Sequence, residues 1–187
     1  MIDVEKPVWL LDVDGVLNTV RPGWGGPPKR ALVWSGADNT SYLLRWGPAL
    51  IDRIRALEAA EKVEIRWCTT WCPEAHRLER LWRLPELGRA LHADPMPRGS
   101  DCWPLKQQAA RAVLAEEGRR LIWTDDDALP PPGPQREELT ARGRALLIAP
   151  KPLRGLQPAD LDLIEKFAEG RRMPTHRVAG KHRHTVD

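Results

Sequence analysis

Short apolar runs alternate with longer segments of mixed polarity along the 187-residue chain. The first run, residues 8–13, is almost continuously apolar and leads into acid and glycine, a pattern typical of a strand buried on both faces. Similar runs indicate further strands, and a weaker one completes a set of five. The later strands are predicted at 63–68, 89–93, 120–124 and 145–149.

Helical spacing of apolar residues fills the intervals between these runs. Leu50, Ile54 and Leu57 give one segment a single apolar face, and Pro48 suits its first turn. The predicted helices cover 48–61, 73–84, 104–117, a segment ending near 142, and 158–168. Strands alternating with helices predict an α/β fold: a doubly wound, Rossmann-like three-layer sandwich around a parallel five-stranded sheet.

Residues 19–47 interrupt this alternation and are rich in Gly, Pro and Trp. Two strand-like stretches, 31–35 and 41–46, flank a Gly-Ala-Asp-Asn turn and predict a β-hairpin. We expect this hairpin to form a small flap. With no repeat and no second boundary visible, the sequence predicts one domain over residues 1–170.

The composition is that of a globular protein, with 42% hydrophobic and 29% charged residues. No apolar run reaches the roughly 18 residues of a membrane span, and the N-terminus lacks the pattern of a signal peptide. We therefore expect a cytoplasmic protein that does not enter membranes.

The net charge of +3 is unevenly distributed. Residues 171–187 carry five basic side chains against one Asp, a net of +4, so the rest of the chain is near neutral. We expect this basic tail to be mobile. A near-neutral body is not typical of a dedicated nucleic-acid binder.

Polar side chains gather where the predicted strands end. Because ligands of such folds bind beyond the carboxyl ends of the strands, we expect these side chains to converge on one edge of the sheet. The set comprises two carboxylates after the first strand, two hydroxyls after the second, one lysine at a helix start, and two carboxylates after the fourth: Asp12, Asp14, Thr69, Thr70, Lys106, Asp125 and Asp126.

This set of residue types predicts phosphoryl-transfer chemistry. Carboxylates without His or Cys select Mg²⁺, which neutralises their mutual repulsion. Lys106 supplies a point charge for an anionic substrate. The Asp12 carboxylate can attack phosphorus, and Asp14, two residues on, can act as general acid and then base. An aspartyl-phosphate intermediate follows.

Four motifs in this order resemble those of the haloacid dehalogenase (HAD) superfamily. LDVDGVLN at 11–18 resembles its first motif, Thr69 its second, Lys106 its third and IWTDD at 122–126 its fourth. The resemblance implies a HAD-like hydrolase fold, and Asp at position 14 favours the phosphatase branch over the dehalogenases.

The same resemblance implies a role for each residue. Asp12 would be the nucleophile and a metal ligand, while Asp14 would be the acid/base and lend its backbone carbonyl to Mg²⁺. Lys106 and a hydroxyl would hold the phosphoryl group; Thr69 is the first choice and Thr70 its rival, because Thr69 could instead cap the following helix. The implied metal ligands after the fourth strand are Asp125, with Asp126 second.

Two further segments are similar to small single-domain HAD proteins of actinobacteria. These are WCTTW at 67–71 and LPELG at 84–88, and some relatives of that group are attached to RNA-repair proteins. The intervals 19–47 and 71–105 leave no room for a folded cap domain. The predicted site is therefore open and could accept a small metabolite or a phosphorylated nucleic-acid end.

Three functions stay open from the sequence. The first is an Mg²⁺-dependent phosphomonoester hydrolase, and the second is a polynucleotide-end phosphatase in nucleic-acid repair. The third is a non-catalytic HAD-like binding module. The sequence fixes neither the substrate nor the oligomeric state.

Tryptophan usage is unusual, with nine Trp against one Phe and one Tyr. Five of the nine lie next to the motifs, where packing of strand ends is the expected role. Three belong to the flap and are possible substrate contacts. These three are Trp24, Trp34 and Trp46.

Overall fold

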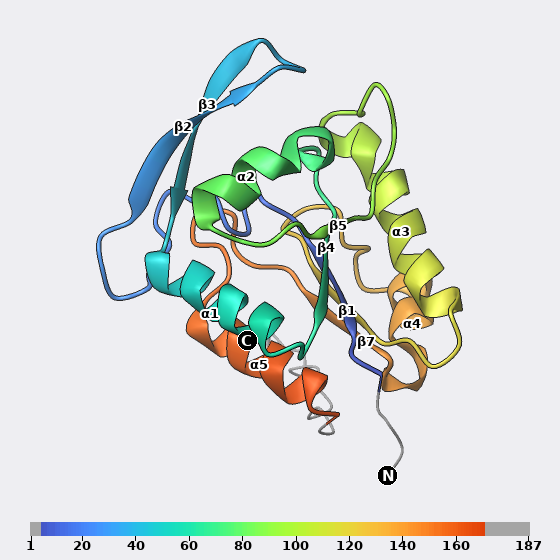
Figure 1. Cartoon of the computed structure of the whole chain (residues 1–187). Coiled ribbons are helices and arrows are strands. Elements are labelled where there is room, and N and C mark those ends of the chain that lie inside the picture. The colour runs from blue at the N-terminus through green and yellow to red at the C-terminus, as the bar shows by residue number, and fades with distance from the viewer. Residues whose placement is uncertain (1–4, 171–187) are drawn as a thin grey trace, which may run out of the picture.

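A computed structural model of the chain describes residues 5–170, and a five-stranded sheet forms its centre (Figure 1). All four neighbouring pairs of strands are parallel, in the order β5-β4-β1-β6-β7. The predicted α/β class and parallel sheet are thereby confirmed. The strands are β1 (Val8–Leu11), β4 (Glu64–Trp67), β5 (Gly88–Arg89), β6 (Leu121–Thr124) and β7 (Ala145–Ile148).

Helices flank the sheet. Helix α1 contacts α5, and α3 contacts α4; in Figure 1 the two pairs lie on opposite sides of the strands. Proline opens four of them at the first or second position, where its missing N–H leaves no bond unmade. The α-helices are α1 (Pro48–Ala59), α2 (Ala75–Trp82), α3 (Trp103–Ala115), α4 (Pro134–Thr140) and α5 (Pro158–Ala168).

The predicted hairpin is present between β1 and α1. Strands β2 (Lys29–Ser35) and β3 (Thr40–Trp46) pair antiparallel as a separate two-stranded sheet that projects beyond the main sheet (Figure 1). Val33 and Leu44 are buried, whereas Leu32 and Leu43 are exposed. One face of the hairpin therefore packs on the domain, and the other faces outward.

Two predicted elements differ most from the structure, and the bounds of others shift by one or two residues. The strand expected at 89–93 is reduced to the two residues of β5, which pair with β4 alone. The helix expected at 73–84 divides into a 3₁₀ turn, η1 (Cys72–Glu74), and α2. Helix α2 ends where Arg83 adopts left-handed backbone angles, with φ of 52°. Two other 3₁₀ turns are η2 (Gly99–Cys102) and η3 (Ala141–Gly143).

Three tryptophans of the central strands are buried in the core. Trp9, Trp67 and Trp123 are fully buried. The Trp9 indole N–H donates to Thr124 Oγ1 at 3.0 Å, which ties β1 to β6. The expected packing role is thus visible for these three tryptophans, whereas Trp103 is 36% exposed. The basic tail lies outside the described residues, and none of the described helices is long and apolar enough to cross a membrane.

Candidate functional site

The parallel register brings Asp12 and Asp125 to the same edge of the sheet. Leu11 at the end of β1 is paired with Thr124 at the end of β6, so the next residue of each strand is an aspartate. The Asp12 N–H donates to the Thr124 carbonyl at 3.1 Å, and the Asp125 N–H donates to the Ile148 carbonyl at 3.2 Å. The backbone of both aspartates is therefore fixed by the extension of the strand ladder.

Lys106 joins the two carboxylates. It lies in the first turn of α3, and its Nζ donates to Asp12 Oδ2 and to Asp125 Oδ2, both at 2.8 Å. The three residues are 4%, 5% and 0% exposed, respectively. A lysine so deeply buried is rare unless it is paired, which separates it from an ordinary surface lysine.

Burial sets the electrostatics of this group. Desolvation raises the pKa of Asp12 to about 7; the Lys106 ammonium opposes the rise and the Asp125 carboxylate adds to it. For Lys106, burial lowers the pKa, but Asp12 and Asp125 together outweigh it, so the pKa is raised. Lys106 is therefore a permanent cation at this edge, while Asp12 titrates near neutrality in the absence of metal.

Four carboxylates approach closely enough to share a cation. One oxygen from each of Asp12, Asp125, Asp126 and Asp127 lies within 4.8 Å of the others. Burial first, then the charges of Asp127 and Asp125, raise the pKa of Asp126 to about 6. This group contains three of the four predicted metal-binding residues. The carboxylate of the fourth, Asp14, does not belong to it.

Asp127 was not among the predicted metal-binding residues, and the structure places it in the group. Asp125 Oδ1 accepts the backbone N–H of Asp127 at 3.2 Å and that of Ala128 at 2.8 Å. These bonds fold the chain back after β6, so three successive carboxylates face one point. The sequence signal was the run of three aspartates at a strand end.

Gly15 makes room for Asp126. Its φ is +72°, and a Cβ at this position would lie 2.1 Å from Asp126 Oδ2. Both the backbone angle and the close contact require glycine. The glycine that follows the two aspartates of the first motif therefore has a geometric role in assembling the acidic group.

Asp14 is exposed, and two neutral donors hold its carboxylate. Asn18 Nδ2 donates to Oδ1 at 2.6 Å, and the Trp71 indole N–H donates to Oδ2 at 3.1 Å. Asn18 also accepts the Arg45 backbone N–H of β3 at 2.8 Å. Asn18 thus links Asp14 to the hairpin, a role beyond a local bond within the turn.

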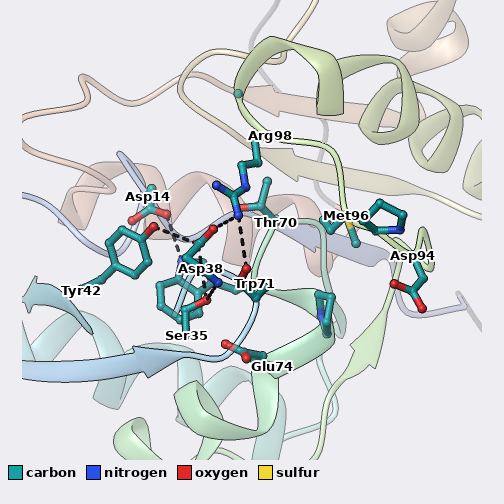
Figure 2. Close-up of a pocket in the computed structure, with 14 residues that line it drawn as sticks. Asp14, Ser35, Asp38, Tyr42, Thr70, Trp71, Glu74, Asp94, Met96 and Arg98 are labelled. Atoms are coloured by element: carbon teal, nitrogen blue, oxygen red, sulfur yellow. Dashed lines mark hydrogen bonds and ion pairs between the residues drawn. The ribbon is translucent and has the colours of Figure 1, made fainter. Parts of the chain in front are cut away.

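A cavity of about 510 Å³ opens beside Asp14 (Figure 2). The hairpin contributes Ser35, Asp38 and Tyr42 to its wall, and the loop after β4 contributes Trp71. Further lining comes from the segment that begins η1 and from the loop between β5 and η2: Pro73, Glu74, Asp94, Pro95, Met96, Arg98 and Gly99. Asp14, two residues after Asp12, thus lines a space large enough for a small ligand.

The two candidate hydroxyls differ in their surroundings. Thr69 is buried, and its Oγ1 accepts the Trp71 N–H at 3.4 Å, as a residue that caps a turn would. Thr70 is only partly buried and lines the cavity. Thr69 lies two residues beyond the end of β4, one place past the residue opposite Asp12, since Leu11 pairs with Trp67. The two threonines therefore stay alternatives for phosphate binding.

None of the three hairpin tryptophans lines this cavity. The Trp24 indole N–H donates to the Leu156 carbonyl at 2.8 Å, and Trp46 packs edge-on against Trp82 at 6.1 Å between ring centroids. Trp34 is 44% exposed on the outer face. The aromatic hairpin residue at the cavity is instead Tyr42, which the sequence reasoning missed.

Comparisons with models of protein families, with curated proteins and with solved structures found no significant match.

Proposed function

We propose that the chain is an Mg²⁺-dependent phosphomonoester hydrolase of the HAD type. Asp12 is the nucleophile, and Asp14 is the general acid and base. The supporting observation is the combination of a buried Asp12–Lys106–Asp125 group with an exposed, oriented Asp14 beside a cavity. A purely structural ion pair would need neither the second aspartate nor the cavity.

The donor set fits a hard divalent cation. Asp12, Asp125, Asp126 and Asp127 offer carboxylate oxygens only, and their mutual distances allow one ion to contact several of them. We assign Mg²⁺ to this group, with the Asp14 backbone carbonyl as a further ligand. When bound, the ion would neutralise charge on the phosphoryl oxygens and favour the ionised form of Asp12.

The side chains then divide the reaction between them. An Asp12 carboxylate oxygen forms a bond to phosphorus as the bond to the leaving oxygen breaks, and Asp14 gives its proton to that oxygen. Lys106, with the Thr69 or Thr70 hydroxyl, holds the phosphoryl oxygens. In the second half, Asp14 removes a proton from water, the water oxygen bonds to phosphorus, and the bond from Asp12 to phosphorus breaks to release inorganic phosphate.

The finer architecture belongs to the same proposal. We assign a doubly wound, capless HAD core in which the β2–β3 hairpin acts as a flap over the cavity. The hairpin tip is held down at two points: Glu74 Oε1 accepts the Gly36 N–H at 2.6 Å, and Arg98 pairs with Asp38. Of the open alternatives, the polynucleotide-end phosphatase is disfavoured, because carboxylates outnumber basic side chains around the cavity.

Hydrolysis of p-nitrophenyl phosphate, with and without Mg²⁺, tests the proposal. We expect release of phosphate that depends on Mg²⁺ and falls about 10³-fold or more in Asp12→Asn, since the nucleophile is lost. Asp52→Asn is the matched control, because it makes the same chemical change on the exposed surface of α1. Its rate should equal that of the wild type.

Two results would contradict the proposal. One is equal, Mg²⁺-independent turnover by the wild type and Asp12→Asn. The other is inactivity of both proteins towards aryl and alkyl phosphates between pH 5 and 9, which would favour the non-catalytic binding module. Trapping of a phosphorylated Asp12 by mass spectrometry would add direct support.

A further inference from the structure

The charge of the cavity beside Asp14 is unbalanced. Apart from Asp14 itself, three carboxylates line it: Asp38, Glu74 and Asp94. Arg98 is the one basic side chain among the lining residues. A phosphate ester that binds with its phosphorus near Asp12 would place its leaving group in this space, because Asp14 must reach the leaving oxygen.

Arg98 already has one of these carboxylates as its partner. It pairs with Asp38 and also donates to the Ala37 carbonyl at 3.4 Å, both in the hairpin turn (Figure 2). Asp38 also accepts the Tyr42 hydroxyl at 2.8 Å. The one positive charge of the lining is therefore offset by Asp38, and the lining as a whole keeps a net negative charge.

The remaining carboxylates face the cavity without full compensation. Glu74 uses Oε1 to accept the Gly36 N–H, and its Oε2 lies 3.9 Å from Arg77 Nε, a long contact near the surface. Asp94 is exposed at the rim and makes no hydrogen bond or ion pair with any other described residue. An anionic leaving group would meet this negative field, whereas a cationic one would be attracted.

Aromatic rings complete the wall. Tyr42 and Trp71 contact each other edge to face with 5.6 Å between centroids, and both line the cavity. Aromatic faces attract ammonium groups, and organic cations are commonly bound where aromatic rings and carboxylates occur together. Apolar lining by Pro95 and Met96 suits the alkyl part of such a group.

We propose that this cavity selects phosphomonoesters whose leaving group is an organic cation of the ammonium type. The proposal rests on the phosphomonoester hydrolase function given above and adds its substrate class. The carboxylates near the cavity supply charge selectivity, and Tyr42 with Trp71 supplies the surface against which the cation packs.

Three esters of similar size and different charge form the test. They are trimethylammonioethyl phosphate, its uncharged dimethylbutyl isostere, and carboxyethyl phosphate. We expect the wild type to hydrolyse the cationic ester with a kcat/KM at least about tenfold above that of the anionic ester. Raising the salt concentration should reduce the ratio, because screening weakens the field.

Variants distinguish the electrostatic effect of the cavity on the ratio from differences in the intrinsic reactivity of the esters. Asp94→Asn should lower the cationic-to-anionic ratio about threefold, and Asp94→Lys should lower it about tenfold or more. Glu117→Gln is the matched control: it removes one exposed negative charge after α3, at the opposite edge of the sheet, and should leave the ratio unchanged.

The outcomes separate this inference from the proposed function. If the wild type hydrolyses p-nitrophenyl phosphate in an Asp12-dependent manner but prefers the anionic ester, or prefers neither, the selectivity proposal is overturned and the hydrolase stands. An equal change of the ratio in Asp94→Asn and Glu117→Gln also overturns it. Absence of Asp12-dependent hydrolysis of every ester refutes the hydrolase itself.

Discussion

Replacing Lys106 by methionine removes the cation between two buried carboxylates. The substitution keeps the length of the side chain and much of its apolar stem, so packing at the start of α3 is largely preserved. Asp12 and Asp125 then lose the donor that lies 2.8 Å from each of them. Because both are buried, water cannot take over the role of the ammonium.

The size of the effect follows from the loss of a buried ion pair, which costs about 3–5 kcal/mol in other proteins. We therefore expect a loss of about 3–5 kcal/mol in the free energy of unfolding at pH 7.5. Because the pKa of Asp12 is already about 7 in the wild type, its carboxyl group is largely protonated at pH 5. Removing Lys106 at pH 5 then leaves one ionised carboxylate fewer without a partner, so the loss should be smaller there.

Urea unfolding of metal-free protein, followed by tryptophan fluorescence at pH 7.5 and pH 5, measures this difference. The prediction is that Lys106→Met is strongly destabilised relative to the wild type at pH 7.5 and much less so at pH 5. Lys62→Met serves as the control, because Lys62 makes an exposed pair with Glu169 at 3.6 Å. Its loss should be below about 1 kcal/mol at either pH.

Two findings would refute the reasoning. A destabilisation of the same size at both pH values would mean that lost packing, not uncompensated charge, dominates. A loss below about 1 kcal/mol at pH 7.5 would mean that the carboxylates find another partner or are hydrated in solution.

Three other predictions concern the same edge of the sheet and its support. Because the pKa values of Asp12 and Asp126 are raised to about 7 and about 6, Mg²⁺ must displace protons at low pH. Its affinity, measured by titration calorimetry, should rise from pH 5 to about pH 7 and then level off; a pH-independent affinity would contradict this. Gly15→Ala should weaken Mg²⁺ binding at least about tenfold and destabilise the fold by about 1–3 kcal/mol, because its Cβ would collide with Asp126 at a positive φ; unchanged calorimetry would count against the contact. Glu79→Gln should cost about 2–4 kcal/mol in thermal or urea unfolding at pH 7, because buried Glu79 pairs with Arg89 at 2.7 Å. Although burial raises the pKa of Glu79, the hydrogen bonds it accepts lower it overall, so this stabilisation should be lost as the pH falls below about 4.5; an unchanged midpoint at pH 7 would show that the pair is dispensable.

The site residues that the sequence predicts best are those that directly follow a strand. Asp12 and Asp125 each follow a four-residue buried strand, and parallel strands place their carboxyl ends together. Lys106 was predicted from its place at the start of a helix. The sequence does not indicate that its ammonium group contacts both carboxylates. Asp127 depends on two backbone hydrogen bonds to Asp125, a turn geometry that no residue pattern specifies.

In the hairpin, position along the strand predicts which side chains face the domain better than residue type does. Tryptophan suggested Trp34 and Trp46 as substrate contacts, but alternation along a strand decides which side chains face the domain. Tyr42 and Leu44 share the inward face with Trp46, and Trp34 points outward with Leu32. Tyr42 lies two residues before Leu44 on the same strand, so alternation predicts that it shares the inward face. The depth at which Trp46 packs could not be inferred, because Trp82 reaches it from a distant helix.

Asn18 connects these observations to the chemistry. It donates to the Asp14 carboxylate at 2.6 Å and accepts the Arg45 N–H of β3 at 2.8 Å, so one amide positions both the proposed acid/base and the strand that carries Tyr42. Trp71 repeats the arrangement, since its N–H holds Asp14 while its ring contacts Tyr42. The proposed proton donor and the wall of the proposed leaving-group cavity are thus held by the same two side chains. A displaced hairpin would therefore alter the recognition of the leaving group and its protonation together.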